Sequence, residues 1–163
     1  MEPDPNNRIG RVTTKGKFSE YPVPSKNIPG QVIPNQITAG PDGAVWFTAV
    51  GKQGGGPTVV DRISTKGEFK EFKVPGGRRD LWGITTGPDG ALWFCENMSN
   101  KVVRMTTGGG FTEYPTPTKK VPIQSGTSFV ISPTWIVSGP RKTIWFTENG
   151  ANNIAVLRQT NAK

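Results

Sequence analysis

The sequence predicts an all-β protein, a β-propeller of four-stranded antiparallel blades, and three observations lead to this fold. A Gly-Pro-Asp-Gly-Ala turn followed by Trp-Phe occurs at 40–48 and 87–95, and a diverged copy lies at 139–147. The chain has 21 Gly and 15 Pro residues, which disfavour helix interiors. Short apolar runs of strand length flank every turn. A unit of four strands that repeats about every 50 residues is typical of propeller blades.

The chain is expected to be a single propeller-repeat domain over residues 1–163, with its elements in the order of the repeat. Residues 6–25 predict two outer strands, and 36–75 and 83–115 predict complete blades. Residues 134–158 predict the first three strands of a closing blade.

Within a blade, the residue pattern assigns each strand its place. The first strand precedes a turn in which Pro sets φ and Asp-Gly suits a tight reversal. The second strand, as in Val45-Trp-Phe-Thr, is apolar on both faces, which indicates burial between neighbouring sheets. The third ends at a Thr-Lys-Gly turn. The fourth, as in Phe69-Lys-Glu-Phe, alternates apolar and charged residues and is expected to be the half-exposed outer strand.

The strand count predicts a ring that one chain leaves open. About three blades are too few, since known propellers close with about four to eight. Two chains supply the strands of six blades, with one spare strand per chain because residues 8–13 and 153–158 compete for one position. We therefore expect a homodimer with a six-bladed ring. A chain that is part of a longer propeller explains the same count.

The composition excludes several classes of function. The chain has no histidine, which removes Ser-His-Asp and Cys-His catalysis and the usual zinc motifs. The N-terminal MEPDPNNRIG lacks the apolar run of a signal peptide, and no stretch reaches the roughly 18 apolar residues of a membrane helix. We expect a cytoplasmic protein with no membrane partner. The net charge of +8 is spread along the chain, so nucleic acid is not an expected partner.

Any site is expected where the connections between strands vary in length, on the rim that carries the links between blades. Glu96-Asn97 and Glu148-Asn149 follow Trp-Phe-Cys and Trp-Phe-Thr at equivalent positions. Their oxygens suit Mg²⁺ or Ca²⁺, and the alternative is that they are solvated at a blade corner.

Charged and aromatic residues in the links between blades are candidates for ligand binding. In one link, Arg78, Arg79 and Asp80 with Trp82 could hold an anionic, stackable ligand, or Trp82 could pack between blades. Trp135 ends the longest link and is a ligand contact or a loop anchor. We assign Trp46, Trp93 and Trp145 to blade packing, and Cys95 to the core as an inert thiol.

The repeat closely resembles that of the virginiamycin B lyase family. The resemblance rests on residues 37–48, their copy at 84–95, and Asn100-Lys-Val-Val-Arg-Met-Thr-Thr with Phe111-Thr-Glu-Tyr-Pro, and it spans about residues 6–158. It implies a seven-bladed propeller and a magnesium-dependent elimination that linearises a cyclic depsipeptide lactone. In that chemistry, glutamates hold the metal and a histidine moves the proton.

This chain departs from the family pattern because it has no histidine and fewer than half the blades. We therefore expect a non-catalytic binding module for a small molecule or polypeptide at the channel mouth. The alternative is a metal-dependent C–O lyase or lactone hydrolase that uses Glu96, Glu148 and a base other than histidine.

Overall fold

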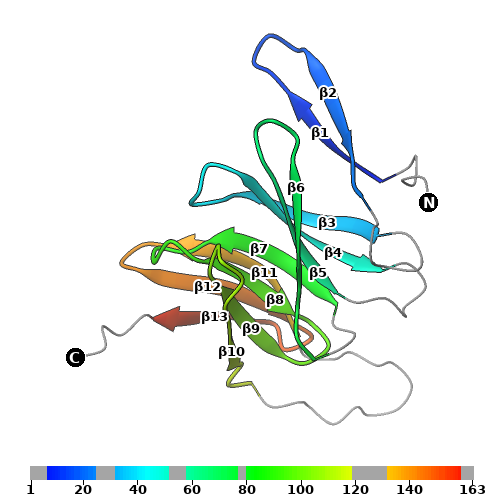
Figure 1. The fold of residues 1–163 in the computed structure, drawn as a ribbon. Coiled ribbons are helices and arrows are strands. Elements are labelled where there is room, and N and C mark those ends of the chain that lie inside the picture. Colours follow the sequence, from blue (N-terminus) through cyan, green and yellow to red (C-terminus); the bar gives the residue numbers. More distant parts are fainter. Residues whose placement is uncertain (1–6, 25–31, 52–57, 77–79, 119–131, 159–163) are drawn as a thin grey trace.

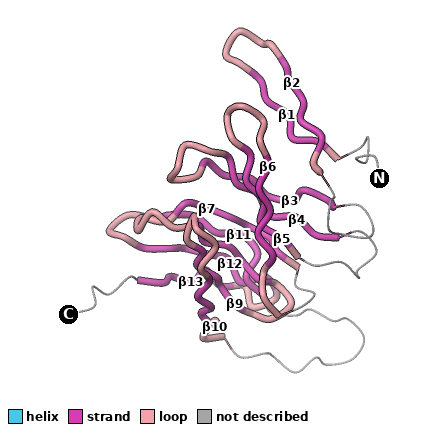
Figure 2. The backbone as a smooth tube through the Cα atoms, viewed as in Figure 1, coloured by secondary structure: helices cyan, strands magenta, loops and turns pink. Residues whose placement is uncertain are grey.

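The computed structural model describes residues 7–24, 32–51, 58–76, 80–118 and 132–158, and all 13 elements in these ranges are β-strands (Figures 1 and 2). The all-β class predicted from the turns and apolar runs is therefore confirmed. Within these ranges there is no helix long and apolar enough to cross a bilayer.

The strands form four antiparallel sheets of two, four, four and three strands in chain order, which is the count that the repeat predicts. The first sheet is a hairpin, and the last lacks a fourth strand within the described residues. The hairpin consists of β1 (Arg8–Val12) and β2 (Phe18–Pro22). The first complete blade consists of β3 (Val32–Ala39), β4 (Val45–Gly51), β5 (Val59–Ile63) and β6 (Phe69–Lys73). The second consists of β7 (Leu81–Thr86), β8 (Leu92–Glu96), β9 (Lys101–Met105) and β10 (Phe111–Pro115). The third consists of β11 (Ser132–Gly139), β12 (Thr143–Asn149) and β13 (Asn153–Arg158).

The first strands of consecutive blades lie side by side, so that β7 contacts both β3 and β11 (Figure 1). Each first strand has an irregular register at the same point, between residues 34 and 37, 81 and 84, and 133 and 136. At Gly83, a Cβ atom would lie 2.8 Å from the backbone carbonyl oxygen of Thr134. Only glycine allows this approach of β7 to β11, which brings the corners of the two blades together.

Each pair of neighbouring sheets encloses one cluster of the hydrophobic core. Trp46 stacks on Phe72 with ring centroids 5.1 Å apart, and Trp93 stacks on Tyr114 at 5.4 Å. Both tryptophans are fully buried against the next blade. Trp145 differs from the prediction because its side chain is 38% exposed. Within the described residues, no blade covers the outer face of the third sheet, so this tryptophan has nothing to pack against.

The two complete blades share a polar lock at the turn before the second strand. The Asp42 carboxylate accepts hydrogen bonds from Trp46 Nε1 at 2.9 Å and Arg62 Nε at 2.6 Å. Asp89 does the same with Trp93 Nε1 at 2.9 Å and Arg104 Nε at 2.5 Å. Burial alone would raise the pKa of each aspartate, but these hydrogen bonds hold it below the usual value.

The third blade has lost this lock. Its turn carries Arg141 and Lys142 instead of Asp-Gly, and Trp145 Nε1 donates instead to Thr143 Oγ1 at 2.8 Å. Val156 lies opposite Trp145, where the complete blades have arginine. The acid and its basic partner are thus both absent from this blade.

Candidate functional site

The two candidate glutamates end the second strands of neighbouring blades, and both are buried. Glu96 is 0% and Glu148 is 3% exposed, so neither is a solvated corner residue. Ser99 Oγ donates to Glu96 Oε2 at 2.6 Å, within the same turn. Thr118 Oγ1, from the link that leaves the second blade, donates to Glu148 Oε2 at 2.5 Å. Hydroxyl groups from the chain itself therefore satisfy one oxygen of each buried carboxylate.

A chain of hydrogen bonds connects the corner of the second blade to its neighbours. The backbone N–H of Asn97 donates to the carbonyl oxygen of Asp80 at 2.9 Å. The side-chain Nδ2 of Asn97 donates to Ser132 Oγ at 2.7 Å, at the start of β11. The Asn97–Asp80 bond lies within the second blade, and the Asn97 side chain joins that blade to the third.

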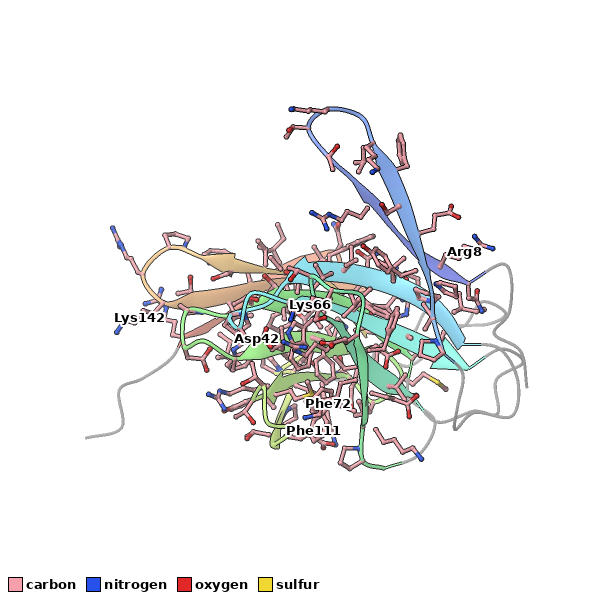
Figure 3. The ribbon with its side chains drawn as sticks, turned by 45° about the horizontal axis from the view of Figure 1, so that its top comes forward. Arg8, Asp42, Lys66, Phe72, Phe111 and Lys142 are labelled. Atoms are coloured by element: carbon pink, nitrogen blue, oxygen red, sulfur yellow. The ribbon has the colours of Figure 1, made fainter. Side chains whose placement is uncertain are left out.

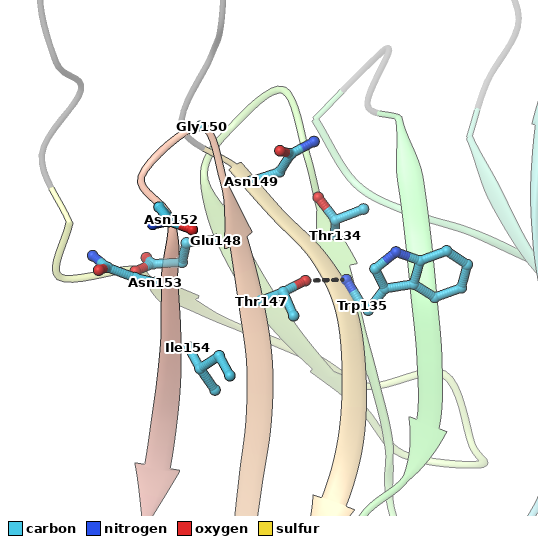
Figure 4. A pocket seen from close by; sticks show the side chains of 9 residues that line it. All are labelled: Thr134, Trp135, Thr147, Glu148, Asn149, Gly150, Asn152, Asn153 and Ile154. Atoms are coloured by element: carbon cyan, nitrogen blue, oxygen red, sulfur yellow. Dashed lines mark hydrogen bonds between the residues drawn. The ribbon is translucent and has the colours of Figure 1, made fainter.

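A cavity of about 660 Å³ lies at the corner of the third blade, and it contains three of the predicted residues, Trp135, Glu148 and Asn149 (Figure 4). The Trp135 side chain is 52% exposed, and its backbone N–H donates to Thr147 Oγ1 at 3.2 Å. Glu148 Oε1 is buried and accepts no hydrogen bond from the described residues. The cavity therefore offers an exposed indole face, whereas the Glu148 oxygen without a hydrogen bond is itself buried.

Sequence reasoning missed the other polar residues of this cavity. They come from β11, β12, the turn before β13 and the first position of β13, and they are Thr134, Thr147, Asn152 and Asn153 (Figure 4). The run Asn149-Gly-Ala-Asn-Asn153 was the available signal, because three carboxamides in one short turn form an unusual concentration of hydrogen-bonding groups.

The remaining predicted residues that the structure describes do not line this cavity. Arg78 and Arg79 lie outside the described residues. Trp82 is 37% exposed, and its carbonyl oxygen accepts from Thr48 Oγ1 at 2.9 Å, a bond that joins the first two blades. Cys95 is buried, and burial raises the pKa of its thiol, which fits the inert core role expected for it.

The described residues contain no cluster of three or more His, Cys, Asp or Glu side chains that could hold a metal ion. The oxygens around Glu148 are nevertheless of the kind that Mg²⁺ and Ca²⁺ prefer. Among the described residues that line the cavity, Glu148 has the only carboxylate, so a cation there would need carboxamide oxygens to complete its shell.

Four-stranded sheets packed face to face around their first strands define the chain as a β-propeller repeat protein. The model of the virginiamycin B lyase family matches residues 4–162, and the chain belongs to that family. A comparison with curated proteins gives no significant match.

Solved lyase structures are similar to this chain. A catalytically inactive His-to-Ala variant of virginiamycin B lyase from Staphylococcus aureus, with quinupristin, is 39% identical with a TM-score of 0.76. The match covers 96% of this chain and 47% of that one. A streptogramin B lyase is 33% identical with a TM-score of 0.69, over 96% and 49% of the two chains.

A gluconolactonase-type structure at 16% identity, with a TM-score of 0.58 over 87% and 50% of the two chains, supports the fold alone. The chain spans about half the length of these structures.

Proposed function

We propose that this chain is a non-catalytic binding module of the virginiamycin B lyase type, which holds a small molecule or polypeptide at the end of its channel. One observation carries this proposal. The 163-residue sequence contains no histidine, whereas the similar lyase is catalytically inactive when one histidine is replaced by alanine. A positioned proton-transfer group typically contributes about 10²- to 10⁴-fold to rate. These residues alone therefore lack a group on which the family's reaction depends.

The cavity of the third blade supports an amide-rich ligand. Asn149, Asn152 and Asn153 each offer both a donor and an acceptor, which match the N–H and C=O groups of a peptide or depsipeptide. The exposed ring of Trp135 offers an apolar face on which a ring or side chain of the ligand can stack. Apolar lining with a few convergent polar groups is typical of ligand sites.

Titration with quinupristin, the ligand of the similar lyase structure, tests this function. We expect saturable quenching of tryptophan fluorescence and, by mass spectrometry, no linear product above the no-protein control. Trp135→Ala should weaken binding about 10-fold, since stacking of this kind contributes about 1 kcal/mol or more. Trp82→Ala is the matched control, because that exposed tryptophan lies outside the cavity and its loss should leave the affinity unchanged.

Two results would contradict the proposal. Linear product well above the control would show that the chain is an enzyme, and equal losses of affinity in the two tryptophan variants would place the ligand elsewhere.

A second function, a metal-dependent C–O lyase or lactone hydrolase, is favoured by the buried oxygen of Glu148 that accepts no hydrogen bond from the described residues. A divalent cation bound there would polarise a carbonyl oxygen of the substrate. Terbium luminescence with competition by Mg²⁺ or Ca²⁺ tests the site without relying on turnover. This second function requires luminescence that Glu148→Gln abolishes, and an equal signal from both proteins would exclude a site at Glu148.

A further inference from the structure

The β1–β2 hairpin stands in the position of the third and fourth strands of an incomplete blade. It pairs Val12 with Phe18, as β5 and β6 pair Ile63 with Phe69. A Cβ atom on Gly67 would lie 2.8 Å from the Tyr21 ring, and one on Gly109 would lie 2.9 Å from the Phe72 ring. The hairpin therefore packs on the first complete blade as that blade packs on the second.

A groove of about 390 Å³ lies beside β1, where a complete blade would place its second strand. Among the described strands, β1 pairs only with β2, so its other edge is open. The groove is mainly apolar, with Val12 and Ile37 more than half exposed. Its lining comes from the hairpin and the first blade and includes Ile9, Arg11, Val12, Tyr21, Ile37 and Ile63. An open strand edge beside an apolar surface is suited to receive another strand.

We propose that this groove binds a β-hairpin with a Gly-Pro-Asp-Gly-Ala-x-Trp turn, supplied by another polypeptide segment. Its aspartate would pair with Arg11, and its tryptophan would stack on Tyr21. The expected occupant is thus a hairpin with an acidic turn and one tryptophan, and its binding does not depend on the ligand proposed above.

The pairing of Arg11 follows from its position in the repeat. Arg11 lies opposite Ser19, one residue before the Val12–Phe18 pair, which is the position of Arg62 and Arg104 in the complete blades. Both of those arginines bind the aspartate of their own turn, at 2.6 and 2.5 Å. Arg11 forms no ion pair with any acidic residue in the described ranges, so none of these residues supplies its counterpart in this blade.

The stacking partner follows from the same repeat. Tyr21 occupies the position of Phe72 and Tyr114, and each of those rings stacks on the tryptophan of its own blade. In both blades that tryptophan lies directly opposite the arginine, as Trp46 lies opposite Arg62. One hairpin can therefore place its tryptophan on Tyr21 and its aspartate on Arg11 together.

A second copy of this chain fits the groove less well. Its three-stranded sheet offers the hairpin β11–β12, whose turn carries Arg141 and Lys142 instead of aspartate and glycine. Seating that turn beside Arg11 would bring like charges together, which is unfavourable. In Figure 3, Lys142 lies at the opposite end of the molecule from Arg8 and the β1–β2 hairpin. The homodimer predicted from the strand count stays a prediction. The positive charge of Arg11 favours an occupant with an acidic turn over a second copy of this chain.

A hairpin peptide with the sequence of residues 34–50 tests the groove. An isolated two-stranded hairpin is only marginally stable, so added terminal cysteines close it with a disulfide. We expect saturable 1:1 binding by fluorescence anisotropy and slower hydrogen exchange of the β1 amides. Asp42→Arg in the peptide, or Arg11→Asp in the chain, should each weaken binding at least about 10-fold, and the two changes together should restore it.

The control and the contrary results are defined by the same assay. Lys15→Asp lies in the turn of the β1–β2 hairpin and changes the net charge by the same amount as Arg11→Asp. This variant should bind the peptide as the unchanged chain does. Circular dichroism confirms that the exposed Arg11→Asp variant is folded. The proposal would be overturned if the Asp42→Arg peptide failed to regain affinity for the Arg11→Asp chain. Equal affinity of the unchanged chain for the unchanged and Asp42→Arg peptides, or no slowing of hydrogen exchange in β1, would overturn it as well. A chain that dimerises through β1 and is not displaced by the peptide would identify a second copy as the occupant.

Discussion

Replacing Asp61 by asparagine tests how strongly a single buried carboxylate limits the stability of this fold. Asp61 lies in β5 and is only 4% exposed. It is paired with Phe47 in β4 and with Glu71 in β6. Burial, and then the negative charge of Glu71, raise the pKa of Asp61 from 3.8 to about 7. The folded state therefore favours the neutral acid.

The sign of the pH dependence follows from this raised pKa. Well below pH 4, Asp61 is protonated in both the folded and unfolded states, and its contribution to stability is fully present. As the pH rises from about 4 to about 7, the unfolded state ionises while the folded state stays protonated, so the contribution is lost progressively and the loss is complete above pH 7. A rise from 3.8 to about 7 corresponds to a ceiling of about 4 kcal/mol, at about 1.4 kcal/mol per pKa unit.

Urea denaturation monitored by tryptophan fluorescence, at intervals from pH 4 to pH 8, measures the effect. We expect Asp61→Asn to have nearly the same free energy of unfolding as the unchanged chain at pH 4. At pH 8 it should be more stable by about 2 to 4 kcal/mol. Glu71→Gln should recover a smaller part, because it removes only the second cause, and the exposed Glu68→Gln serves as control. A difference between Asp61→Asn and the unchanged chain that does not vary with pH would refute this reasoning.

Three further predictions concern the turns and the assembly. Lys142 has a φ of 58°, a left-handed conformation that is strained for lysine and not for glycine. Lys142→Gly should therefore raise the free energy of unfolding by about 1 kcal/mol in urea denaturation, and a decrease would show that the backbone is not strained there. Asp89→Ala should cost about 2 to 3 kcal/mol by removing the acceptor of Trp93 and Arg104, whereas Asp89→Asn, which keeps one acceptor oxygen, should cost less. Equal losses would show that the lock contributes little. Light scattering of the chain alone should give a mass near 17.6 kDa if the occupant of the groove is a hairpin from another polypeptide. It should give twice that mass if two copies of the chain complete a six-bladed ring.

The sequence alone was sufficient for the strand order and the blade repeat, because the signals for both are local. The Gly-Pro-Asp-Gly turns specify where the chain reverses, and the alternation in Phe69-Lys-Glu-Phe specifies an outer strand. Trp46 and Trp93 could be assigned to the core because they recur in register. Trp145 recurs in the same register, but its burial depends on a neighbouring blade, which local pattern does not reveal.

The tertiary structure decided the character of the site. The glutamates were predicted as candidates, but no local pattern reveals that both are buried. Thr118 reaches Glu148 from 30 residues away, and the cavity joins Trp135 to the carboxamides of a turn in another part of the blade. The same holds for Asp61, whose sequence context gives no sign of burial and whose pKa is raised to about 7 because the folded structure buries it beside Glu71. Burial and hydrogen-bond partners come from segments distant in sequence, and they determine the pKa of a carboxylate more than its neighbours in the chain do.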